Sequence, residues 1–319
     1  MWHVLFGTEK YRAYDIVKTI DKRRYRCDFG DLEHADLGQF DCVVPQVFSD
    51  YDALKSKMDQ RGIKFWCPKP ETVDLCDDKL ALNKFLLGGA FAELVPPLLE
   101  KEAGRYPYIL KKRTDENGAH AFVIRTLDDE RAFTNLLDSP EYFCQTYVPG
   151  REEFAVHILY VHDEIAYAQT VKYEFVEKVY AKGQHFCLKR RTYLSNNDHL
   201  DAFAKILRSV EYTGTCCIDY KMQDGQPQIL EINPRGGSSL PRDINRYLEA
   251  YLASLGIMQP AQFKYHYMRP TQDGLPTRAQ MYLRAHLPDG VRRSIGKARR
   301  ILRQPLSALG RNHAGKTPI

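Results

Sequence analysis

The sequence predicts an α/β protein in which a short parallel-sheet unit precedes a larger part of mixed helices and antiparallel strands. In the first 75 residues, short apolar runs alternate with helix-like segments, as in a parallel sheet with crossover helices. Farther along, Asn117-Gly118 and Asp224-Gly225 each lie between apolar runs, which is typical of two-residue hairpin turns. With 319 residues and 44% hydrophobic content, the chain can fill the cores of about two or three compact units.

The N-terminal unit is expected to hold about three strands with intervening helices. Pro45 stands where the third strand should stop, because proline cannot donate a hydrogen bond to a sheet. In the second helix, Ser49 or Asp50 can cap the N-terminus and Gly62 can close the C-terminus. The expected strands are residues 3–7, 24–31 and 40–48, and the expected helices are residues 11–20 and 49–62.

After residue 75 the patterns predict further helices and two hairpins. Acids at the start of one helix suit the positive end of its dipole, and another helix has its apolar side chains on one face. Beyond residue 255 the pattern weakens. The expected helices are residues 76–87, 127–139 and 198–212, the expected strands are a pair joined at residues 117–118 and one over 142–148, and the expected hairpins are residues 152–176, turning at 162–164, and 213–233.

Composition and missing motifs narrow the class of protein. Eight cysteines form no C-x-x-C pair and several lie in apolar runs, so reduced thiols in a cytoplasmic protein are favoured over a disulfide framework. There is no run of about 18 apolar residues for a spanning helix, and the N-terminus does not resemble a signal peptide. Without H-E-x-x-H, G-x-x-x-x-G-K-[ST] or G-x-G-x-x-G, no zinc protease, P-loop or dinucleotide fold is indicated.

The net charge of +5 arises in the C-terminal tail. Residues 291–319 hold eight Lys or Arg and no acid, so the rest of the chain, with eight fewer positive charges, stands at −3. A mildly acidic body does not indicate a nucleic-acid-binding surface. Ile295, Ala298 and Leu302 recur at helical spacing among the arginines, which allows peripheral contact with an anionic membrane or a lipid-linked substrate, although a solvated extension is favoured.

A carboxylate and an amide share one face of a strand in "QILEINPRGG", residues 228–237. Glu231 and Asn233 point the same way because strand side chains alternate, and Pro234 ends the strand. The preceding strand of the hairpin could bring Asp219 to the same end. Such oxygen ligands suit Mg²⁺, which usually takes its other ligands from phosphates. The ordinary alternative to a metal site is that these acids are exposed to solvent and bind no ligand.

Two lysines are candidates for binding those phosphates. Lys79 stands at the start of a helix, where a positive charge is unfavourable for the helix dipole. A lysine at this position therefore suggests a role other than stabilising the helix. Lys111 ends the apolar run "PYIL" and is followed by two more cations. Each lysine taken singly is more often a solvated surface residue.

Together and in this order, the motifs resemble the carboxylate–amine ligases of the ATP-grasp superfamily, which include carbamoyl-phosphate-synthase-like and D-alanine–D-alanine-ligase-like domains. The resemblance covers residues 1–245. "CDDKLALNKFL" resembles the family's Asp-Lys helix, and "YPYILKKR" resembles its lysine strand. "FCQTYVPGREEFAVHIL" resembles the hinge strand that holds adenine and the following segment whose acid holds ribose. "CIDYKMQDGQPQILEINPRGG" resembles the metal-binding hairpin.

The resemblance implies a short Rossmann-like domain followed by an ATP-grasp domain whose two α+β subdomains clasp ATP. The implied parts are the N-terminal domain over residues 1–75, the small lid subdomain with its leading helix over 76–148, the large subdomain with the metal site over 149–260, and a C-terminal extension over 261–319.

The resemblance also implies roles for individual residues. Between the neighbouring acids Glu152 and Glu153, strand alternation favours Glu153 as the ribose ligand. Helix capping explains the two serines after the glycines equally well. The implied roles are catalysis by Arg235 and Lys111, ATP binding by Lys79, Lys111, Gln145, Thr146, Tyr147, Val148 and Glu153, binding of two Mg²⁺ or Mn²⁺ ions by Asp219, Glu231 and Asn233, and substrate contact by Ser238, Ser239, Arg242 and Arg191.

The lid departs from the family pattern, because "TDENGAHA" has one glycine where several are usual, Lys112 replaces a common proline, and Thr146 stands in place of a frequent Glu. An unusual phosphate clamp or a weakened enzyme would explain the difference. The clamp candidates are Arg113, Asn117 and His120. The basic residues Lys172, Arg190 and Arg191 could hold an anionic substrate, although a solvated face is commoner.

The implied activity is ATP-dependent joining of a carboxylate to an amine through an acyl phosphate, with an amino acid, a peptide or a sugar acid as substrate. A phosphotransferase of the same fold and a nucleotide-binding regulatory protein with a weakened lid are the alternatives. The expected location is the cytoplasm, with contact at the inner membrane face left open. The expected partners are small molecules rather than nucleic acid, and a homodimer is left open.

Overall fold

The computed structural model describes residues 1–8, 10–57, 62–100, 105–115, 118–182, 188–259 and 272–273. All of them belong to one compact unit, Met1–Gly274. The basic tail over residues 291–319 lies outside the described residues, as does nearly all of the predicted extension over 261–319. Within the described ranges, no helix is both long and apolar enough to cross a bilayer.

The N-terminal residues form the predicted parallel sheet, in the order β2-β1-β3. Its strands are β1 (Trp2–Phe6), β2 (Tyr25–Phe29) and β3 (Cys42–Val44), connected through α1 (Lys10–Thr19) and the short 3₁₀ helix η1 (Leu37–Gln39) and followed by α2 (Phe48–Lys55). The predicted cap of α2 is wrong. Val47 precedes the helix, and Asp50 lies inside its first turn, where its carboxylate accepts the N–H groups of Gln46 and Val47. The helix also ends at Lys55 rather than at Gly62.

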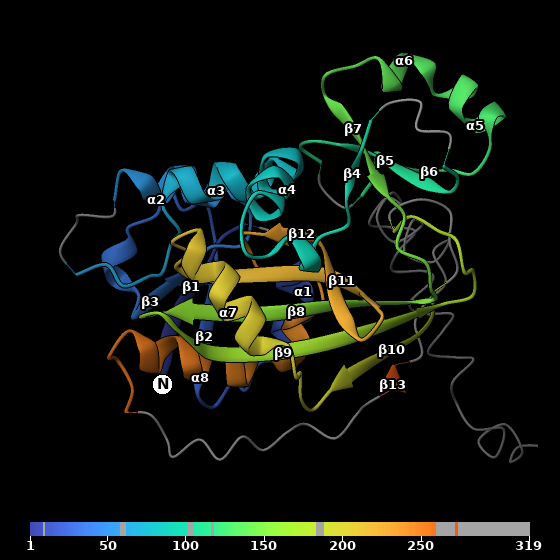
Figure 1. The fold of residues 1–319 in the computed structure, drawn as a ribbon. Coiled ribbons are helices and arrows are strands. Elements are labelled where there is room, and N and C mark those ends of the chain that lie inside the picture. The colour runs from blue at the N-terminus through green and yellow to red at the C-terminus, as the bar shows by residue number, and fades with distance from the viewer. Residues whose placement is uncertain are drawn as a thin grey trace, which may run out of the picture. The chain divides into compact units, whose positions relative to one another are not determined.

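The central sheet is antiparallel, in the order β12-β11-β8-β9-β10-β13 (Figure 1). Both predicted hairpins are confirmed, and His162, Asp163, Asp224 and Gly225 have the positive φ that such tight turns require. The strands are β8 (Glu152–Val161), β9 (Glu164–Phe175), β10 (Leu188–Leu194), β11 (Gly214–Gln223), β12 (Gln226–Asn233) and β13 (Gln272–Asp273).

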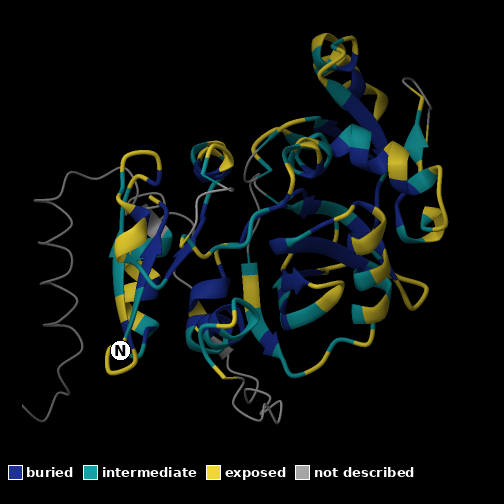
Figure 2. Ribbon diagram, turned by 90° about the vertical axis from the view of Figure 1, so that its left-hand side faces the viewer, coloured by how far each residue is buried: buried dark blue, intermediate teal, exposed yellow. Residues whose placement is uncertain are grey.

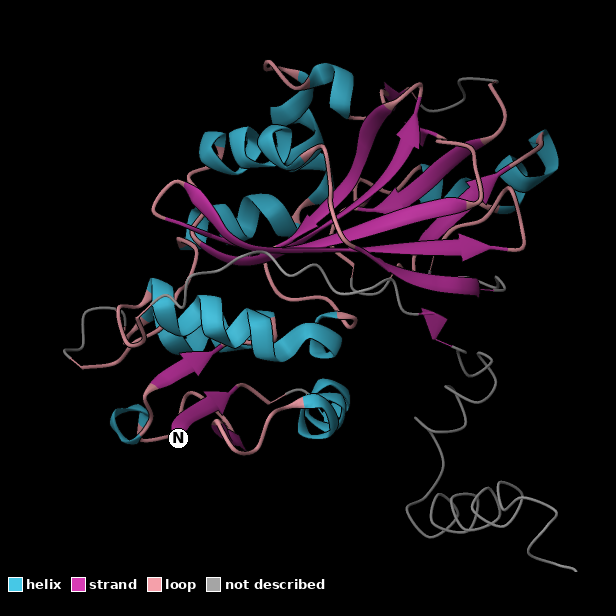
Figure 3. Cartoon of the chain, turned by 90° about the horizontal axis from the view of Figure 1, so that it is seen from below, coloured by secondary structure: helices cyan, strands magenta, loops and turns pink. Residues whose placement is uncertain are grey.

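A strand buried on both faces holds the core together. In β8, Val156 and Ile158 share a core with α7 (Leu200–Ser209), whereas Leu159 and Val161 share another with α8 (Ile244–Ser254). This explains why β8 is a continuous apolar run rather than an alternating one. Figure 2 shows the burial along the strands, and Figure 3 shows them side by side.

A second antiparallel sheet has the order β4-β7-β5-β6. Tyr108, Ile124 and Cys144 form its core with Leu137. The strands are β4 (Leu98–Leu99), β5 (Tyr108–Lys112), β6 (Ala121–Ile124) and β7 (Tyr142–Thr146), and the helices nearby in the chain are α3 (Pro70–Asp77), α4 (Lys79–Leu87), η2 (Ala92–Leu94), α5 (Leu127–Ala132) and α6 (Thr134–Leu137).

Besides α2, two predicted helices needed correction and one helix was missed. The helix expected over residues 76–87 begins only at Lys79, because Asp78 leaves the helical conformation and caps it by accepting N–H groups of Leu80 and Ala81. The helix expected over residues 127–139 is two short helices that meet at Phe133. Helix α8, which follows the 3₁₀ turn η3 (Leu240–Asp243), was not predicted. The predicted α/β class is nevertheless confirmed, and the domain boundaries at residues 75, 148 and 260 stay predictions.

Helix α8 joins the N-terminal sheet to the central sheet. Val4 and Phe6 of β1 share its core with Tyr247 and Tyr251. The Tyr251 hydroxyl accepts the Trp66 N–H and donates to the Val43 carbonyl, both at 2.8 Å. Helix α8 therefore packs the N-terminal sheet against β8 and β9 of the central sheet, and β8 is the strand next to the polar hairpin described below.

Candidate functional site

The β11–β12 hairpin brings the three predicted metal ligands together. Asp219 lies directly opposite Glu231 in the register, immediately before a bulge. The Asn233 amide donates to Glu231 Oε1 at 3.0 Å. Asp219 is only 8% exposed, and its buried Oδ1 has no hydrogen-bond partner among the described residues. A carboxylate oxygen without a hydrogen bond, close to a second carboxylate and an amide group, is a set of oxygen ligands that suits a hard divalent cation.

The two carboxylates do not ionise alike. Burial raises the pKa of Asp219, and the neighbouring Glu231 adds to the rise while Lys182 opposes it. Burial also opposes ionisation of Glu231, but the Lys79 ammonium and hydrogen bonds from Asp219 and Asn233 outweigh it and lower the pKa of Glu231. The two pKa values therefore move in opposite directions, and Glu231 is the more readily ionised member of the pair.

The two predicted phosphate lysines flank this hairpin. Lys79, at the first residue of α4, donates to the Asp115 carbonyl at 2.7 Å, and its Nζ lies 3.6 Å from Glu231 Oε2. Lys111, near the end of β5, donates to Gln145 Oε1 at 2.9 Å and to the Leu230 carbonyl at 3.4 Å. Burial lowers the pKa of Lys111 to about 8. Both ammonium groups therefore reach β12 from other elements.

The predicted hinge residues make different kinds of hydrogen bond. Gln145, fully buried, holds Lys111 with its oxygen, and its amide donates to Asn83 Oδ1 and the Pro96 carbonyl. The Thr146 N–H donates to the Pro97 carbonyl at 2.9 Å. The Val148 carbonyl accepts from Lys221, a residue that the sequence reasoning missed.

Lys221 is a buried cation behind the hinge. It also donates to the Gly150 carbonyl at 3.0 Å and lies over the rings of Tyr147 and Tyr180. Burial lowers its pKa to about 8. Its place in "CIDYKM" reads only as a strand lysine, so nothing in the sequence marked it.

Lys182 is a second missed residue, and it links two predicted ligands. Its Nζ lies 2.9 Å from Glu153 Oε1 and 3.2 Å from Asp219 Oδ1, the latter without hydrogen-bond geometry. Although burial opposes its charge, Asp219 and Glu153 outweigh burial and raise the pKa of Lys182. Of the two acids left open by the sequence, Glu153 is buried here, whereas Glu152 is exposed and pairs with Lys172.

The loop after β12 is held by a buried histidine. The Gly237 N–H donates to His157 Nδ1 at 3.2 Å, so the other ring nitrogen carries the hydrogen and donates to Ser239 Oγ at 2.7 Å. Burial lowers the pKa of His157 to about 3, which keeps the ring neutral. A β-carbon on Gly237 would lie 2.6 Å from His157 Cε1, so only glycine fits.

Arg235 and the serines of this loop differ in exposure. Arg235 is buried over the Phe48 ring, with its guanidinium carbon 5.7 Å from the centroid. Its Nε has no hydrogen-bond partner in the described part of the chain. Ser238 is exposed, whereas Ser239 is buried and also accepts from Tyr173 at 2.9 Å.

Two of the phosphate-clamp candidates form ion pairs close to Lys79. Arg113 pairs with Asp78, the residue before Lys79, and His120 pairs with Asp115, whose carbonyl accepts from Lys79; their role as a clamp stays a prediction. Asn117, the third clamp candidate, lies outside the described residues. Arg190 pairs with Glu174 at 2.8 Å.

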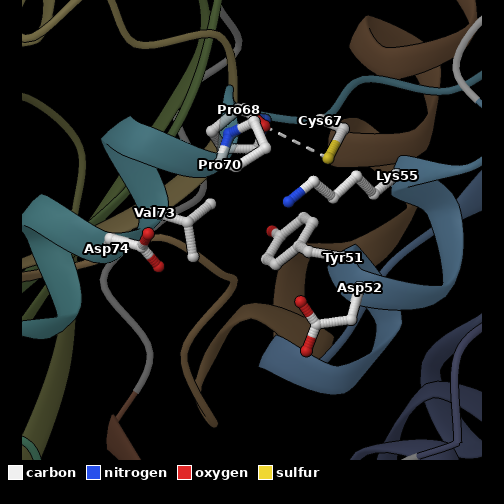
Figure 4. Close-up of a pocket in the computed structure, with 8 residues that line it drawn as sticks. All are labelled: Tyr51, Asp52, Lys55, Cys67, Pro68, Pro70, Val73 and Asp74. Carbon is white, nitrogen blue, oxygen red and sulfur yellow. Dashed lines mark hydrogen bonds between the residues drawn. The ribbon is translucent and has the colours of Figure 1, made fainter.

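A separate small pocket of about 70 Å³ lies between α2 and α3 (Figure 4). Inside it, the Cys67 thiol donates to the Pro68 carbonyl at 3.3 Å. Its lining contains none of the predicted site residues, and is Tyr51, Asp52, Lys55, Cys67, Pro68, Pro70, Val73 and Asp74.

Comparisons with known proteins agree with this geometry. The family model of the ATP-grasp domain matches residues 76–239. No curated protein matches the sequence. Among solved structures, D-alanine–D-alanine ligase from Bacillus anthracis is 13% identical with a TM-score of 0.54, and the match covers 79% of this chain and 96% of that one. N5-carboxyaminoimidazole synthetase from Staphylococcus aureus, complexed with ADP, is 16% identical with a TM-score of 0.60, covering 84% and 80%.

A third similar structure is L-amino acid ligase from Bacillus licheniformis, at 13% identity and a TM-score of 0.57, covering 84% of this chain and 77% of that one. At such low identity these likenesses establish the fold. The family model, however, spans more than half of the chain and includes the lysines, the hinge and the metal hairpin. The chain therefore belongs to the ATP-grasp family.

Proposed function

We propose that the protein is an ATP-dependent ligase that joins a carboxylate to an amine through an acyl phosphate, releasing ADP and phosphate. The observation that carries this proposal is the convergence of Lys79, Lys111 and the carboxylates of the β11–β12 hairpin, which arrive from three separate elements. Family membership and the ligases among the similar structures support the same reaction class.

In this proposal the hairpin binds the metal and the lysines bind the phosphates. Asp219, Glu231 and Asn233 would hold Mg²⁺, with two ions expected and Mn²⁺ as a substitute. When bound, the metal neutralises the charge of the transferring phosphoryl group. Lys79 and Lys111, which both contact β12, would bind phosphate oxygens. Asp219 Oδ1, which accepts no hydrogen bond from a described residue and has only the Lys182 ammonium beside it, at 3.2 Å, supports this assignment.

The nucleotide base and ribose would lie along the hinge. Residues 145–148 contribute backbone atoms to adenine, Gln145 keeps Lys111 in place, and Glu153 accepts the ribose hydroxyls. Lys221 fixes the hinge from behind.

Arg235 is proposed to act on the reacting carboxylate. The carboxylate attacks the γ-phosphate, an acyl phosphate forms, and the amine displaces phosphate from it. A guanidinium fits the charge that develops on the acyl phosphate and on the tetrahedral species. The unused Nε of Arg235 supports a ligand-facing role.

The test is ADP release from ATP over pairs of small carboxylates and amines, followed by identification of the product. Glu231→Gln keeps the size of the side chain but removes its charge, and we expect a loss of at least about a hundredfold in turnover. Glu211→Gln, at an exposed acid paired with Lys69, is the matched control and should keep full activity. Full activity of Glu231→Gln would contradict the site assignment.

The product separates the proposed ligase from its alternatives. An amide indicates the ligase, and a stable phosphorylated product would indicate a phosphotransferase. Nucleotide binding without turnover of any pair would favour a regulatory protein. A cytoplasmic location is part of the proposal, because the described cysteines are free and mostly buried.

A further inference from the structure

One wall of the proposed nucleotide site is formed by apolar side chains of β5 and β6. Ile109 lies two residues before Lys111 on β5, so both side chains point to the same face of the sheet. The register pairs Ile109 with Val123 and Lys111 with Ala121, which puts these two β6 residues on that face as well. The three apolar side chains therefore line the sheet beside the proposed phosphate lysine.

The residues that cover this wall come from the connection after β9. Val179 and Ala181 share one apolar cluster with the three wall residues and with Tyr147 of the hinge. Ala181 and Val123 are both buried in this cluster. An adenine ring that packs on the wall would need the surface that Val179 and Ala181 occupy.

The backbone of the same segment is bound to the hinge. The Tyr147 hydroxyl accepts the Tyr180 N–H at 2.9 Å and donates to the Tyr180 carbonyl at 3.1 Å. These bonds hold residues 178–182 against residues 145–148, along which the base is proposed to lie.

Lys182, at the end of this segment, contacts the two acids of the site. Its Nζ lies 2.9 Å from Glu153 Oε1, the proposed ribose acid, and 3.2 Å from Asp219 Oδ1, a proposed metal ligand. The base wall, the hinge, the ribose acid and a metal ligand are therefore all contacted by one short stretch of chain, residues 178–182.

We propose that residues 178–182 compete with ATP for its site and leave the base wall, the hinge and Glu153 as the nucleotide enters. The observed affinity for ATP is then the intrinsic affinity reduced by the fraction of molecules in which the site is open. The inference rests on the nucleotide site of the proposed function but not on the ligase reaction, so binding alone can test it.

The experiment is calorimetric titration of the full chain with adenosine and with the magnesium complex of a non-hydrolysable ATP analogue. Lys182→Met removes the contact with Glu153, and Tyr147→Phe removes the hydroxyl that holds Tyr180. We expect adenosine to bind about tenfold more tightly to Lys182→Met, whose contact is charge-assisted, and about threefold more tightly to Tyr147→Phe. Lys178→Met, at an exposed lysine of the same segment, is the matched control and should bind both probes as the unmodified chain does.

Adenosine is the decisive probe because it carries no phosphate, so the loss of a cation does not change its affinity through charge. Unchanged or weaker adenosine binding by Lys182→Met would overturn the inference, and weaker binding of the ATP analogue alone would make Lys182 a phosphate ligand instead. Tyr147→Phe, which lacks only an oxygen, decides in the same way if Lys182→Met does not fold.

The same titrations distinguish this inference from the proposed function. Tighter adenosine binding by variants of a chain that turns over no carboxylate–amine pair would refute the ligase reaction and leave the competition intact. If the unmodified chain binds neither probe, the nucleotide site itself is wrong, and the inference with it.

Discussion

Burial gives Lys111 a pKa within the physiological range. Its ammonium is held by one amide oxygen and one backbone carbonyl, and burial lowers its pKa to about 8. Below that pH the group is charged and attracts phosphate, and above it the group is neutral. Affinity for ATP should therefore fall between pH 7 and pH 9, with a midpoint near 8 or above it once phosphate stabilises the charge.

Fluorescence titration with a labelled ATP analogue across this range measures the effect. Lys111→Met should bind more weakly at pH 7 and show a flatter pH profile. Lys221 also has a pKa near 8 but contacts hinge carbonyls. An unchanged slope in Lys111→Met would assign the titration to Lys221 instead.

Gly237 is the residue of the loop with the least room. A β-carbon there would meet His157 Cε1 at 2.6 Å and Cys217 Sγ at 3.0 Å, both on strands of the rigid sheet. Gly237→Ala should lower the free energy of unfolding by about 1–3 kcal/mol, because the added β-carbon overpacks the loop against the sheet. It should also reduce kcat, because the displaced loop carries Arg235. Gly89→Ala, whose β-carbon would make an ordinary contact at 3.6 Å, is the matched control. Equal urea midpoints and kcat for the two variants would contradict this account.

The sequence predicted which site residues lie together when they belong to one hairpin. It did not predict this for a residue that a loop brings to the site. The two-residue turn at Asp224-Gly225 pairs Tyr220 with Ile229, and that register alone would place Asp219 opposite Leu230. The bulge between Asp219 and Tyr220 shifts the register by one residue, so that Asp219 faces Glu231. Lys182 lies thirty-seven positions before Asp219, and its basic run has the composition of a solvated surface. Only the fold of the segment between β9 and β10 brings it to Asp219.

At the scale of elements, α8 makes the N-terminal domain part of the same folded unit. The Tyr251 hydroxyl serves one donor and one acceptor of the N-terminal domain, and both would be left buried without it. Tyr251→Phe should therefore lower the free energy of unfolding by about 1–3 kcal/mol in urea denaturation. Tyr14→Phe, at an exposed tyrosine, should leave it unchanged. A loss that is equal in both variants would show that the hydroxyl bonds contribute nothing.

The elements that the sequence analysis missed have different causes. Helix α8 carries the apolar stripe of a surface helix, at Ile244, Tyr247, Leu248, Tyr251 and Leu252, so its sequence held a usable signal that was not recognised. Strand β10 lies near the edge of the central sheet and carries exposed charged residues. Its sequence therefore lacks the alternation of apolar and polar residues that would predict a strand. The helix expected over residues 76–87 is correct only over Lys79–Leu87, because the capping bonds of Asp78 separate α4 from α3, which ends at Asp77.

For the whole molecule, the charge of the tail is the largest asymmetry in the sequence. The favoured interpretation is a solvated extension, so the full chain and a chain lacking residues 291–319 should sediment equally with anionic liposomes. Electrostatic attraction contributes about 1 kcal/mol per basic residue near such a surface, so contact would be easily detected. Enrichment of the full chain alone in the pellet would contradict the prediction, and loss of that enrichment at high salt would identify it as electrostatic.

Lys182 has a consequence for how the protein meets its metal. Because this ammonium already balances Glu153 and Asp219, the fold does not depend on a divalent ion for local neutrality. In the proposed function, a magnesium ion at this site would compete with Lys182 for Asp219, so its apparent affinity would be a difference between two stabilised arrangements. The folded chain would then outlast removal of magnesium, and only its activity would follow the ion.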